Sequence, residues 1–403
     1  MKSIEKLLRK FEPEHDGKWA KLHPVWDAFY TFMFTPDKTT TSGSHIRDGI
    51  DLKRTMFTVV VALIPALLFG IYNTGHWHFA SLGETTAYWD MFGDKFLYGL
   101  IRVLPIVVVS YAVGLGIEFI FAIKNGHAVQ EGFLVSGMLI PLIVPVDTPL
   151  WMIAVATIFA VVIGKEVFGG TGMNIVNVAL TARAFLFFGY PTMMSGNKVW
   201  VGELSENLDN NKVVDGFSGA TPLGDLASFW SDEPTFSSLA DFSEHWTLLD
   251  SILGYIPGSI GETSLIAIGI GAVILLITGI ASWRIMLSFF AGGLLMAFIF
   301  NQTATNPFME LSPLHQIALG GFAFGAVFMV TDPVTAAQTN TGKYIYGFLA
   351  GLFAILVRVF NPAFPEGVMM AILFFNVMAP LIDHYVIQAN VKRRIKRLKI
   401  KQA

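Results

Sequence analysis

Hydrophobic residues fall in ten separate runs along the chain, divided by shorter polar stretches. Some runs reach the roughly 20 apolar residues that a helix needs to cross a bilayer, whereas several are shorter. The pattern predicts an all-α polytopic membrane protein with about ten transmembrane helices. The predicted segments are residues 56–72, 96–123, 133–146, 149–164, 178–190, 264–282, 285–300, 314–330, 344–360 and 367–386.

Two of the shorter segments contain residues that interrupt helices. Pro141 and Pro145 lie within the third segment, and Gly320, Gly321 and Gly325 lie within the eighth. A broken helix leaves backbone polar groups unpaired, which a membrane protein tolerates only where protein or a cavity satisfies them. We therefore expect both segments to be discontinuous helices enclosed by protein or lining a cavity.

The ten segments form two blocks of five, which favours an internal repeat. Because each block has an odd number of spans, the two copies would be inverted relative to each other in the membrane. The third and eighth segments, which such a repeat equates, end in similar sequences, Val144-Pro145-Val146-Asp147-Thr148-Pro149 and Val330-Thr331-Asp332-Pro333-Val334-Thr335. Binding sites in inverted repeats tend to lie where the two copies meet.

Charged residues concentrate outside these segments and divide the chain into five regions. Residues 1–54 form a basic N-terminal segment with ten Lys or Arg, and residues 387–403 form a basic tail. Between the first five-helix repeat (55–190) and the second (264–386) lies an acidic loop, 191–263, with eleven Asp or Glu and two lysines. Basic flanking segments remain on the cytoplasmic side of a membrane. We therefore expect cytoplasmic termini, a periplasmic loop 191–263, and a multi-pass protein of a bacterial inner membrane.

Composition agrees with a membrane protein and excludes several classes of chemistry. The chain is 53% hydrophobic and 14% charged, and its net charge of -3 does not suggest nucleic-acid binding. It has no cysteine, so this chain forms no disulfides and offers no thiolate ligands to an iron–sulfur cluster. Walker, Rossmann and HExxH motifs are absent from the sequence, and no NADH site is recognisable.

A glycine-rich motif in the acidic loop is the first candidate site. It reads Asp215-Gly216-Phe217-Ser218-Gly219-Ala220-Thr221, followed by a proline. A bare, sharply turned backbone lets a phosphate or a flavin phosphate approach closely. An aliphatic hydroxyl is a weak nucleophile, so covalent chemistry at Thr221 would need activation by a metal or an enzyme. The alternative is an ordinary surface turn.

A second candidate site joins the fourth and fifth segments. The connection contains Gly172, Asn174 and Asn177, and the two asparagines would share a face if one helical turn separated them. Their amide groups suit a polar ring such as an isoalloxazine. The alternative is a packed interhelical turn whose asparagines cap helices.

Ionisable residues at membrane depth are costly and are therefore functional candidates. Glu131 opens the third segment, Asp332 closes the eighth, and Asp383 lies near the end of the tenth. Their oxygen atoms suit a hard cation such as Na⁺, or a proton path. Glu118, within the second segment, is a further acidic candidate. The alternatives are an interfacial position for Asp383 and a position facing lipid or a neighbouring protein for Glu118.

The chain resembles, over essentially its whole length, the family of B subunits of sodium-translocating NADH:quinone oxidoreductases, which are six-subunit bacterial respiratory complexes. The most specific shared feature is Asp215–Thr221, which looks like the family's flavinylation sequence. Gly169-Gly170-Thr171-Gly172, the Asn174/Asn177 segment and Thr331-Asp332-Pro333-Val334 are also similar.

The resemblance implies an electron-transfer subunit that carries FMN in a phosphoester bond to Thr221, attached by a separate flavin transferase. Asp215 would hold the metal ion used during attachment, and Ser218, Gly219 and Ala220 would shape the FMN turn. It further implies a non-covalent riboflavin, for which Gly172, Asn174 and Asn177 are the candidate residues. Electrons would come from an FMN-bearing periplasmic subunit and reduce a quinone, coupled to Na⁺ export along a path containing Glu131, Asp332 and Asp383.

Three other functions fit parts of the sequence. The D subunit of the related ferredoxin:NAD⁺ oxidoreductase complexes shares the fold and the threonine motif. A flavin-free secondary transporter would account for inverted repeats and broken helices, although it gives the loop motif no role. A structural membrane subunit is the third alternative.

Overall fold

The structure is a computed structural model that describes residues 12–13, 23–34, 40–46, 52–85, 87–126, 132–229, 235–361 and 367–402. Within these ranges the chain folds into helices and contains no β-strand. The predicted all-α class is therefore confirmed. The basic N-terminal segment contributes one described helix, α2 (His23–Met33).

All five predicted segments of the first block are helical. The turn η2 lies between the fourth and fifth segments. After α7, the loop between the blocks contains the turn η3 and four short helices, α8 to α11. The elements are α3 (Leu52–Ser81), α4 (Phe92–Asn125), α5 (Phe133–Leu142), α6 (Leu150–Gly164), η2 (Glu166–Phe168), α7 (Val178–Gly189), η3 (Pro191–Met193), α8 (Leu204–Asp209), α9 (Pro222–Ser228), α10 (Leu239–His245) and α11 (Leu248–Leu253).

The second block also contains five of the predicted segments, one of them in pieces. Its eighth predicted segment is divided among α15, α16 and a π-helical turn, η4. The elements are α12 (Leu265–Ile277), α13 (Trp283–Gln302), α14 (Pro307–Glu310), α15 (Pro313–Ala318), α16 (Phe322–Phe324), η4 (Gly325–Met329), α17 (Asn340–Phe360) and α18 (Val368–Gln402). The basic tail predicted from residue 387 onward continues α18 as one helix.

Helix length and apolarity support a multi-pass membrane protein. In the described part of the chain, six helices are long and apolar enough to cross a membrane: α3, α4, α6 together with η2, α13, α17 and α18. The shorter apolar helices are α5, α7 and α12. Together with the broken eighth segment, these elements account for the ten predicted segments.

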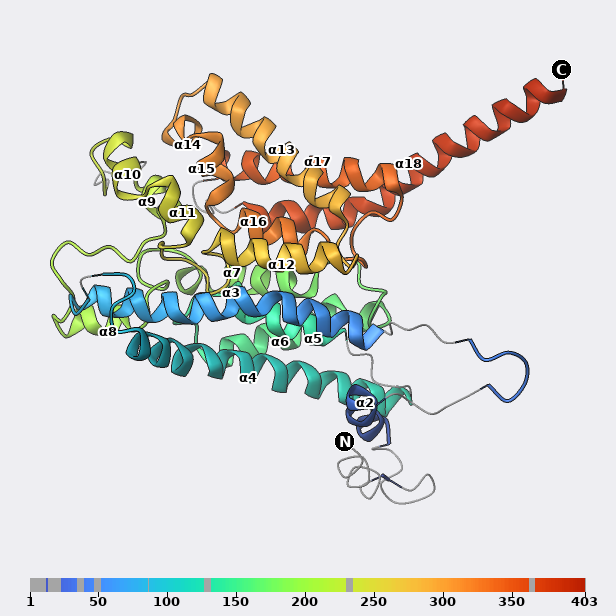
Figure 1. The fold of residues 1–403 in the computed structure, drawn as a ribbon, viewed down its shortest axis with the longest axis horizontal. Coiled ribbons are helices and arrows are strands. Elements are labelled where there is room, and N and C mark those ends of the chain that lie inside the picture. The colour runs from blue at the N-terminus through green and yellow to red at the C-terminus, as the bar shows by residue number, and fades with distance from the viewer. Residues whose placement is uncertain are drawn as a thin grey trace.

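Part of the helix packing recurs in the two blocks, although the α3–α4 contact of the first has no comparably extensive counterpart between α12 and α13, both of which the structure describes. In the first, α4 contacts α5 and α6, and α6 contacts α7; in the second, α13 contacts α15 and α17, and α17 contacts α18. The blocks meet where α3 packs on α12 and where α7 packs on α18. In Figure 1, α2 and the end of α18 lie toward one end of the bundle, and α8 to α11 lie at the other.

Protein groups satisfy the backbone freed at the end of α5, in the third segment, and at the break in the eighth segment. After α5, the Leu142 carbonyl accepts a hydrogen bond from the Gly261 amide at 2.8 Å. In the eighth segment, Gly320 and Gly321 have φ of 64° and 66°, a left-handed conformation that favours glycine. The Leu319 carbonyl there accepts from the Arg358 guanidinium at 3.0 Å. The eighth segment is therefore discontinuous and enclosed by protein, as expected. The third is instead one continuous helix that ends at Leu142, with Pro141 inside it.

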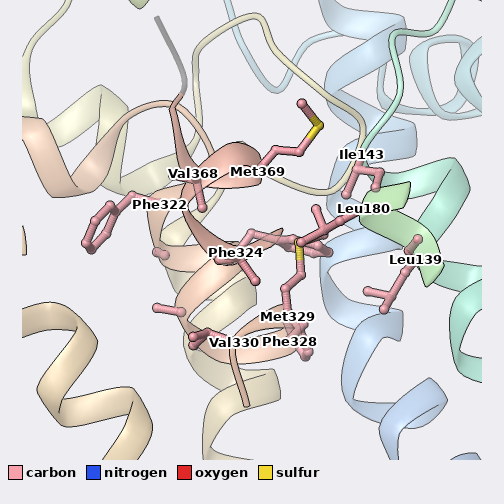
Figure 2. Packing of buried hydrophobic residues seen from close by; sticks show 14 of the residues in the cluster. Leu139, Ile143, Leu180, Phe322, Phe324, Phe328, Met329, Val330, Val368 and Met369 are labelled. Carbon is pink, nitrogen blue, oxygen red and sulfur yellow. The ribbon is translucent and has the colours of Figure 1, made fainter. Parts of the chain in front are cut away.

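The core lies between the two blocks. Phe324, Phe328 and Met329 of the broken segment are buried in one hydrophobic cluster with Leu139 of α5 and Leu180 of α7. Figure 2 shows these side chains gathered together. The central position of the broken segment means that a ligand bound beside it would contact both blocks.

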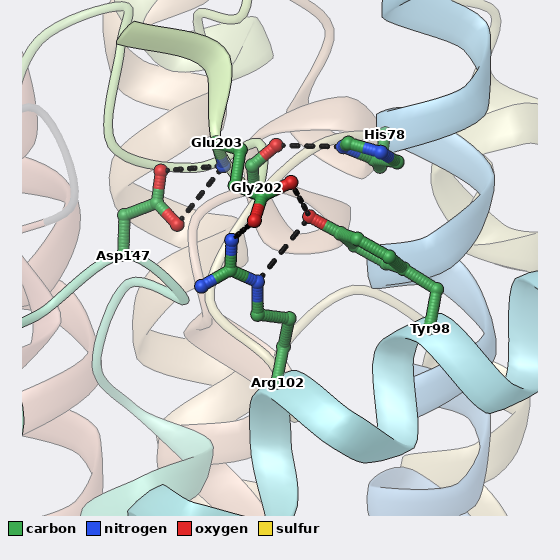
Figure 3. A network of polar contacts seen from close by, with 6 residues as sticks. All are labelled: His78, Tyr98, Arg102, Asp147, Gly202 and Glu203. Carbon is green, nitrogen blue, oxygen red and sulfur yellow. Dashed lines mark hydrogen bonds and ion pairs between the residues drawn. The ribbon is translucent and has the colours of Figure 1, made fainter. Parts of the chain in front are cut away.

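A polar network fastens the 191–263 loop to the helix ends (Figure 3). The Asp147 carboxylate, between α5 and α6, accepts from the Glu203 amide at 2.9 and 3.1 Å. Arg102 of α4 forms an ion pair with the Glu203 side chain, and Tyr98 donates to it at 3.2 Å. Desolvation raises the pKa of Asp147 to about 7, against the opposing charge of Arg102. The network positions the start of the loop that carries Thr221.

Candidate functional site

Thr221 is the residue immediately before α9 and caps that helix. Its Oγ1 accepts a hydrogen bond from the Gly224 amide at 3.1 Å, and Pro222 occupies the first helical position. Both features are typical of a helix start. The side chain is half-buried. The hydroxyl donates no hydrogen bond to any described protein atom, so its proton is not needed for the fold.

The residues before Thr221 form a tight turn. The Ser218 hydroxyl accepts from the Ala220 amide at 3.3 Å, whereas Asp215 is exposed to solvent. Gly219 is buried, and a Cβ there would lie 2.4 Å from Leu204 Cδ2. Glycine is therefore required at 219 for the turn to pack against α8. The motif predicted from sequence is thus a defined turn that presents a threonine.

Thr221 also lines a small hollow that reaches toward the core. Gly258, Glu262, Gly320 and Gly321 line the same hollow. Glu262 forms a buried ion pair with Arg183 of α7 at 2.9 Å. The break in the eighth segment thus lies directly beside Thr221.

An inner cavity brings together residues from both blocks. Asn174 and Asn177 line it with Thr171 and Lys165, and Asp332 lines it from the second block. Its other walls are mostly apolar and include Met56, Val59, Leu139 and Phe328. The hollow measures about 90 Å³, several times the roughly 10–15 Å³ that one buried water needs, so it exceeds what a bare ion requires. Apolar walls with a few convergent polar groups are typical of a site for a small organic molecule.

The two asparagines of this cavity are held differently. Asn177 is buried and caps α7, where its side chain accepts from the Leu180 amide at 3.2 Å. When the Asn376 amide of α18 is oriented to satisfy all its partners, it accepts from the Asn177 backbone amide at 3.1 Å and donates to Tyr346. Asn174 donates to the Val176 carbonyl at 3.2 Å. Gly172 has φ of 90° and shapes the turn without lining the cavity.

Of the residues predicted for the ion path, Asp332 and Asp383 lie at different places in the structure. Asp332 lines the inner cavity and accepts from the Val334 amide and the Thr335 hydroxyl, both at 3.1 Å. Asp383 of α18 lies elsewhere and accepts from the Gln338 amide at 2.6 Å and the Thr339 amide at 3.0 Å. Glu131 lies outside the described residues. Among the residues that are described, no group of three His, Asp or Glu could hold a metal ion.

Two buried ion pairs were not predicted from the sequence. The first is Arg183 with Glu262, and the second is Lys165 with Glu118 of α4. Each residue alone is visible in the sequence as a charge within or beside an apolar segment. The pairing is not visible there, because each pair joins elements distant in sequence.

Comparison with known proteins identifies the family. Residues 39–392 match the model of the NQR2, RnfD, RnfE family. A protein from Chromohalobacter salexigens, named as the B subunit of a Na(+)-translocating NADH-quinone reductase, is 44% identical over 421 residues, covering 98% of this chain and 96% of the relative. Proteins of the same name from Ectopseudomonas mendocina (44% identical, covering 98% of both chains) and Pseudomonas aeruginosa (43%, covering 98% of this chain and 99% of the relative) are similarly close. The chain therefore belongs to the NQR2, RnfD, RnfE family.

Proposed function

We propose that this chain is the membrane electron-transfer B subunit of an Na⁺-translocating NADH–quinone reductase, with FMN covalently attached to Thr221 and riboflavin in the inner cavity. The near-complete coverage of relatives with that name supports this assignment over the D subunit of the sister complexes. When bound, the two flavins would supply electron transfer from a neighbouring flavoprotein to quinone.

The geometry of Thr221 is the observation that carries the proposal. Replacing the hydroxyl proton by a phosphoryl group breaks no described hydrogen bond, and Oγ1 can continue to accept from the Gly224 amide. The turn of Ser218, Gly219 and Ala220 holds the threonine at a fixed position. Asp215 is exposed and free to hold a metal ion when a flavin transferase docks.

The chemistry of its lining supports a flavin ring as the ligand of the inner cavity, which at about 90 Å³ would have to widen to admit the whole ring. The Asn174 and Asn177 side chains would bind the polar edge of the ring, and Met56, Leu139 and Phe328 would contact its faces. Gly172 would let the connecting loop turn closely around it. The Asn376 and Tyr346 side chains would keep Asn177 in position.

The remaining parts of the proposal concern the membrane and the partners. Loop 191–263 would face the periplasm, where an FMN-bearing subunit of a six-subunit complex would reach Thr221. Residues 1–54 and 387–403 would be cytoplasmic, and the chain would reside in a bacterial inner membrane. Glu131, Asp332 and Asp383 would contribute to the Na⁺ path.

Ultraviolet illumination of the denatured chain on a gel tests the proposal. Coexpression with a flavin transferase should give a fluorescent band, and Thr221→Ala should abolish it while leaving expression unchanged. Thr247→Ala, which changes another helix-capping threonine of the same loop, is the matched control and should remain fluorescent. Fluorescence that persists in Thr221→Ala would refute the attachment site.

A further inference from the structure

An open apolar groove lies between α13 and α17, away from both candidate flavin sites. Its volume of about 430 Å³ is within the roughly 300–1,000 Å³ typical of ligand sites. Both helices are long and apolar enough to cross a membrane, so the groove would face the hydrocarbon layer. The lining includes Leu287, Ser288 and Ala291 of α13 and Tyr344 and Phe348 of α17.

Small residues create this groove. A Cβ at Gly347 of α17 would lie 2.6 Å from the Ile285 carbonyl oxygen of α13, so the two helices touch at the level of their backbones. The Ser288 hydroxyl donates to the same carbonyl at 3.1 Å and is thus satisfied within its own helix. Ala291, about one turn further along, is exposed and leaves space that a larger side chain would fill. The groove therefore offers its ligand an apolar surface.

Aromatic rings mark one end of the groove. Trp283 is the first residue of α13, Tyr344 lies near the start of α17, and their ring centroids are 6.1 Å apart. The Arg284 guanidinium carbon lies 5.3 Å from the Trp283 ring centroid, at the distance of a cation–π contact. Because Trp and Tyr are enriched where a membrane meets water, we expect this end of the groove to lie at the level of the lipid headgroups.

Two cations at that end have no carboxylate partner. Arg284 and Lys343 are partly exposed, and neither forms an ion pair with any residue that the structure describes. The Asp383 carboxylate lies near the start of α17, but it accepts from the Gln338 and Thr339 amides. Two unpaired positive charges beside an apolar groove match a ligand with an anionic head and an apolar chain.

The arrangement of the bundle adds to this match. The cations lie where α13 begins, at the end of the bundle toward which the basic tail of α18 extends (Figure 1). The acidic loop with α8 to α11 lies at the other end. Basic residues between membrane-spanning helices, on the side of a basic tail, are typical of sites for anionic lipid headgroups.

We propose that the groove binds one anionic phospholipid of the membrane, with an acyl chain along Ala291 and Phe348 and the phosphate between Arg284 and Lys343. This ligand is additional to the proposed function and does not depend on either flavin. A helix of a neighbouring subunit would cover the apolar groove, but it would leave both cations unpaired unless it carried carboxylates at the same level. A phospholipid supplies both parts in one molecule.

Photolabelling of the protein, purified with its native partners, tests the proposal. Phosphatidylglycerol and phosphatidylcholine with the same diazirine-bearing acyl chain are compared, and peptide mass spectrometry measures the label on α13 and α17. Phosphatidylglycerol should label the groove-lining residues more than phosphatidylcholine does. The double variant Arg284→Gln/Lys343→Gln should lower this preference by at least about tenfold, because each basic residue near an anionic headgroup strengthens binding.

Matched variants separate binding from general effects of charge and bulk. Lys124→Gln/Lys392→Gln removes the same charge from exposed residues outside the groove and should keep the preference. Ala291→Trp fills the groove and should reduce labelling by both lipids. Val273→Trp, at an exposed position of α12 that does not line the groove, should leave labelling at the wild-type level.

Three results would overturn the proposal. Equal labelling by the two lipids in the wild type would mean an ordinary lipid-facing surface. A preference that survives in Arg284→Gln/Lys343→Gln would mean that the headgroup does not bind these cations. Failure of both lipids to label the wild-type groove would mean that a protein neighbour covers it.

Discussion

The Arg183 guanidinium lies 2.9 Å from the Glu262 carboxylate, and both side chains are almost fully buried. Arg183 belongs to α7 of the first block, whereas Glu262 precedes α12 of the second. A Cβ at Gly321 would lie 2.7 Å from the Glu262 carboxyl carbon. The pair therefore joins the two blocks at the break in the eighth segment, beside the hollow that Thr221 lines.

Removal of one partner of this pair should destabilise the protein strongly. Glu262→Ala leaves the Arg183 charge buried without its carboxylate, and breaking such pairs typically costs about 3–5 kcal/mol. Glu203→Ala removes a partly exposed ion pair with Arg102 and should cost about 1 kcal/mol or less. Thermal unfolding of both variants in detergent provides the comparison, and equal losses would contradict the assigned burial.

Gly219→Ala should reduce flavin attachment at Thr221. The added methyl group would lie 2.6 Å from the Asn197 carbonyl oxygen as well as against Leu204, so the turn must shift. Gly189→Ala places a methyl group in open space and serves as the control. In-gel flavin fluorescence, normalised to protein, measures the effect. Wild-type fluorescence in Gly219→Ala would show that attachment tolerates a displaced turn.

Asp225 should make stability depend on pH. Burial raises its pKa to about 6, although the Trp246 indole donates to it at 3.0 Å. The folded state therefore binds an extra proton between about pH 4 and 6, and stability falls as pH rises through that window. Above pH 6 the ionised, buried carboxylate destabilises the folded state by about 3 kcal/mol, at 1.36 kcal/mol per pKa unit. Below the unfolded-state pKa near 4, the carboxyl group is protonated in both states and this destabilisation is absent.

Asp225→Asn removes this charge and keeps an oxygen for the Trp246 indole. We expect a higher melting temperature than wild type at pH 8 and no gain at pH 4. Asp215→Asn, in the exposed part of the same loop, should change neither value. A gain for Asp225→Asn that is equal at both pH values would refute the titration of Asp225.

Substitution of the acidic residues proposed for the ion path should alter redox-driven Na⁺ uptake by vesicles. Asp332→Asn should reduce uptake per electron, because Asp332 lines the inner cavity. Asp383→Asn and Glu131→Gln test the other two positions, and Asp383→Asn should also loosen the backbone at Gln338 and Thr339. Unchanged coupling in all three variants would remove these residues from the path.

The hydrophobic pattern predicted the helices well because the length and apolarity of a membrane-spanning helix can be read from one contiguous stretch of sequence. The segment predicted at 56–72 is longer in the structure, Leu52–Ser81, because polar residues such as His76 and His78 extend the helix beyond its apolar stretch. The break in the eighth segment was also predictable, since Gly320 favours a left-handed backbone conformation, whereas Pro141 lies inside α5 and does not interrupt it.

Tertiary relationships could not be predicted in this way. The convergence of Asn174 and Asp332 on one cavity depends on how the connection before α7 lies relative to the end of the broken eighth segment. The pairing of Lys165 with Glu118 likewise depends on the contact between α4 and α6. Sequence patterns located the charges, and only the fold determines which charges meet.

Mass spectrometry of the peptide that contains Thr221 tests the central claim most directly. The complex, matured with a flavin transferase, should yield this peptide with the added mass of one FMN minus one water, localised to Thr221 by fragmentation. Thr221→Ala should yield only the unmodified peptide. An unmodified wild-type peptide, or FMN localised to Ser218, would contradict the assignment of Thr221 as the flavin anchor.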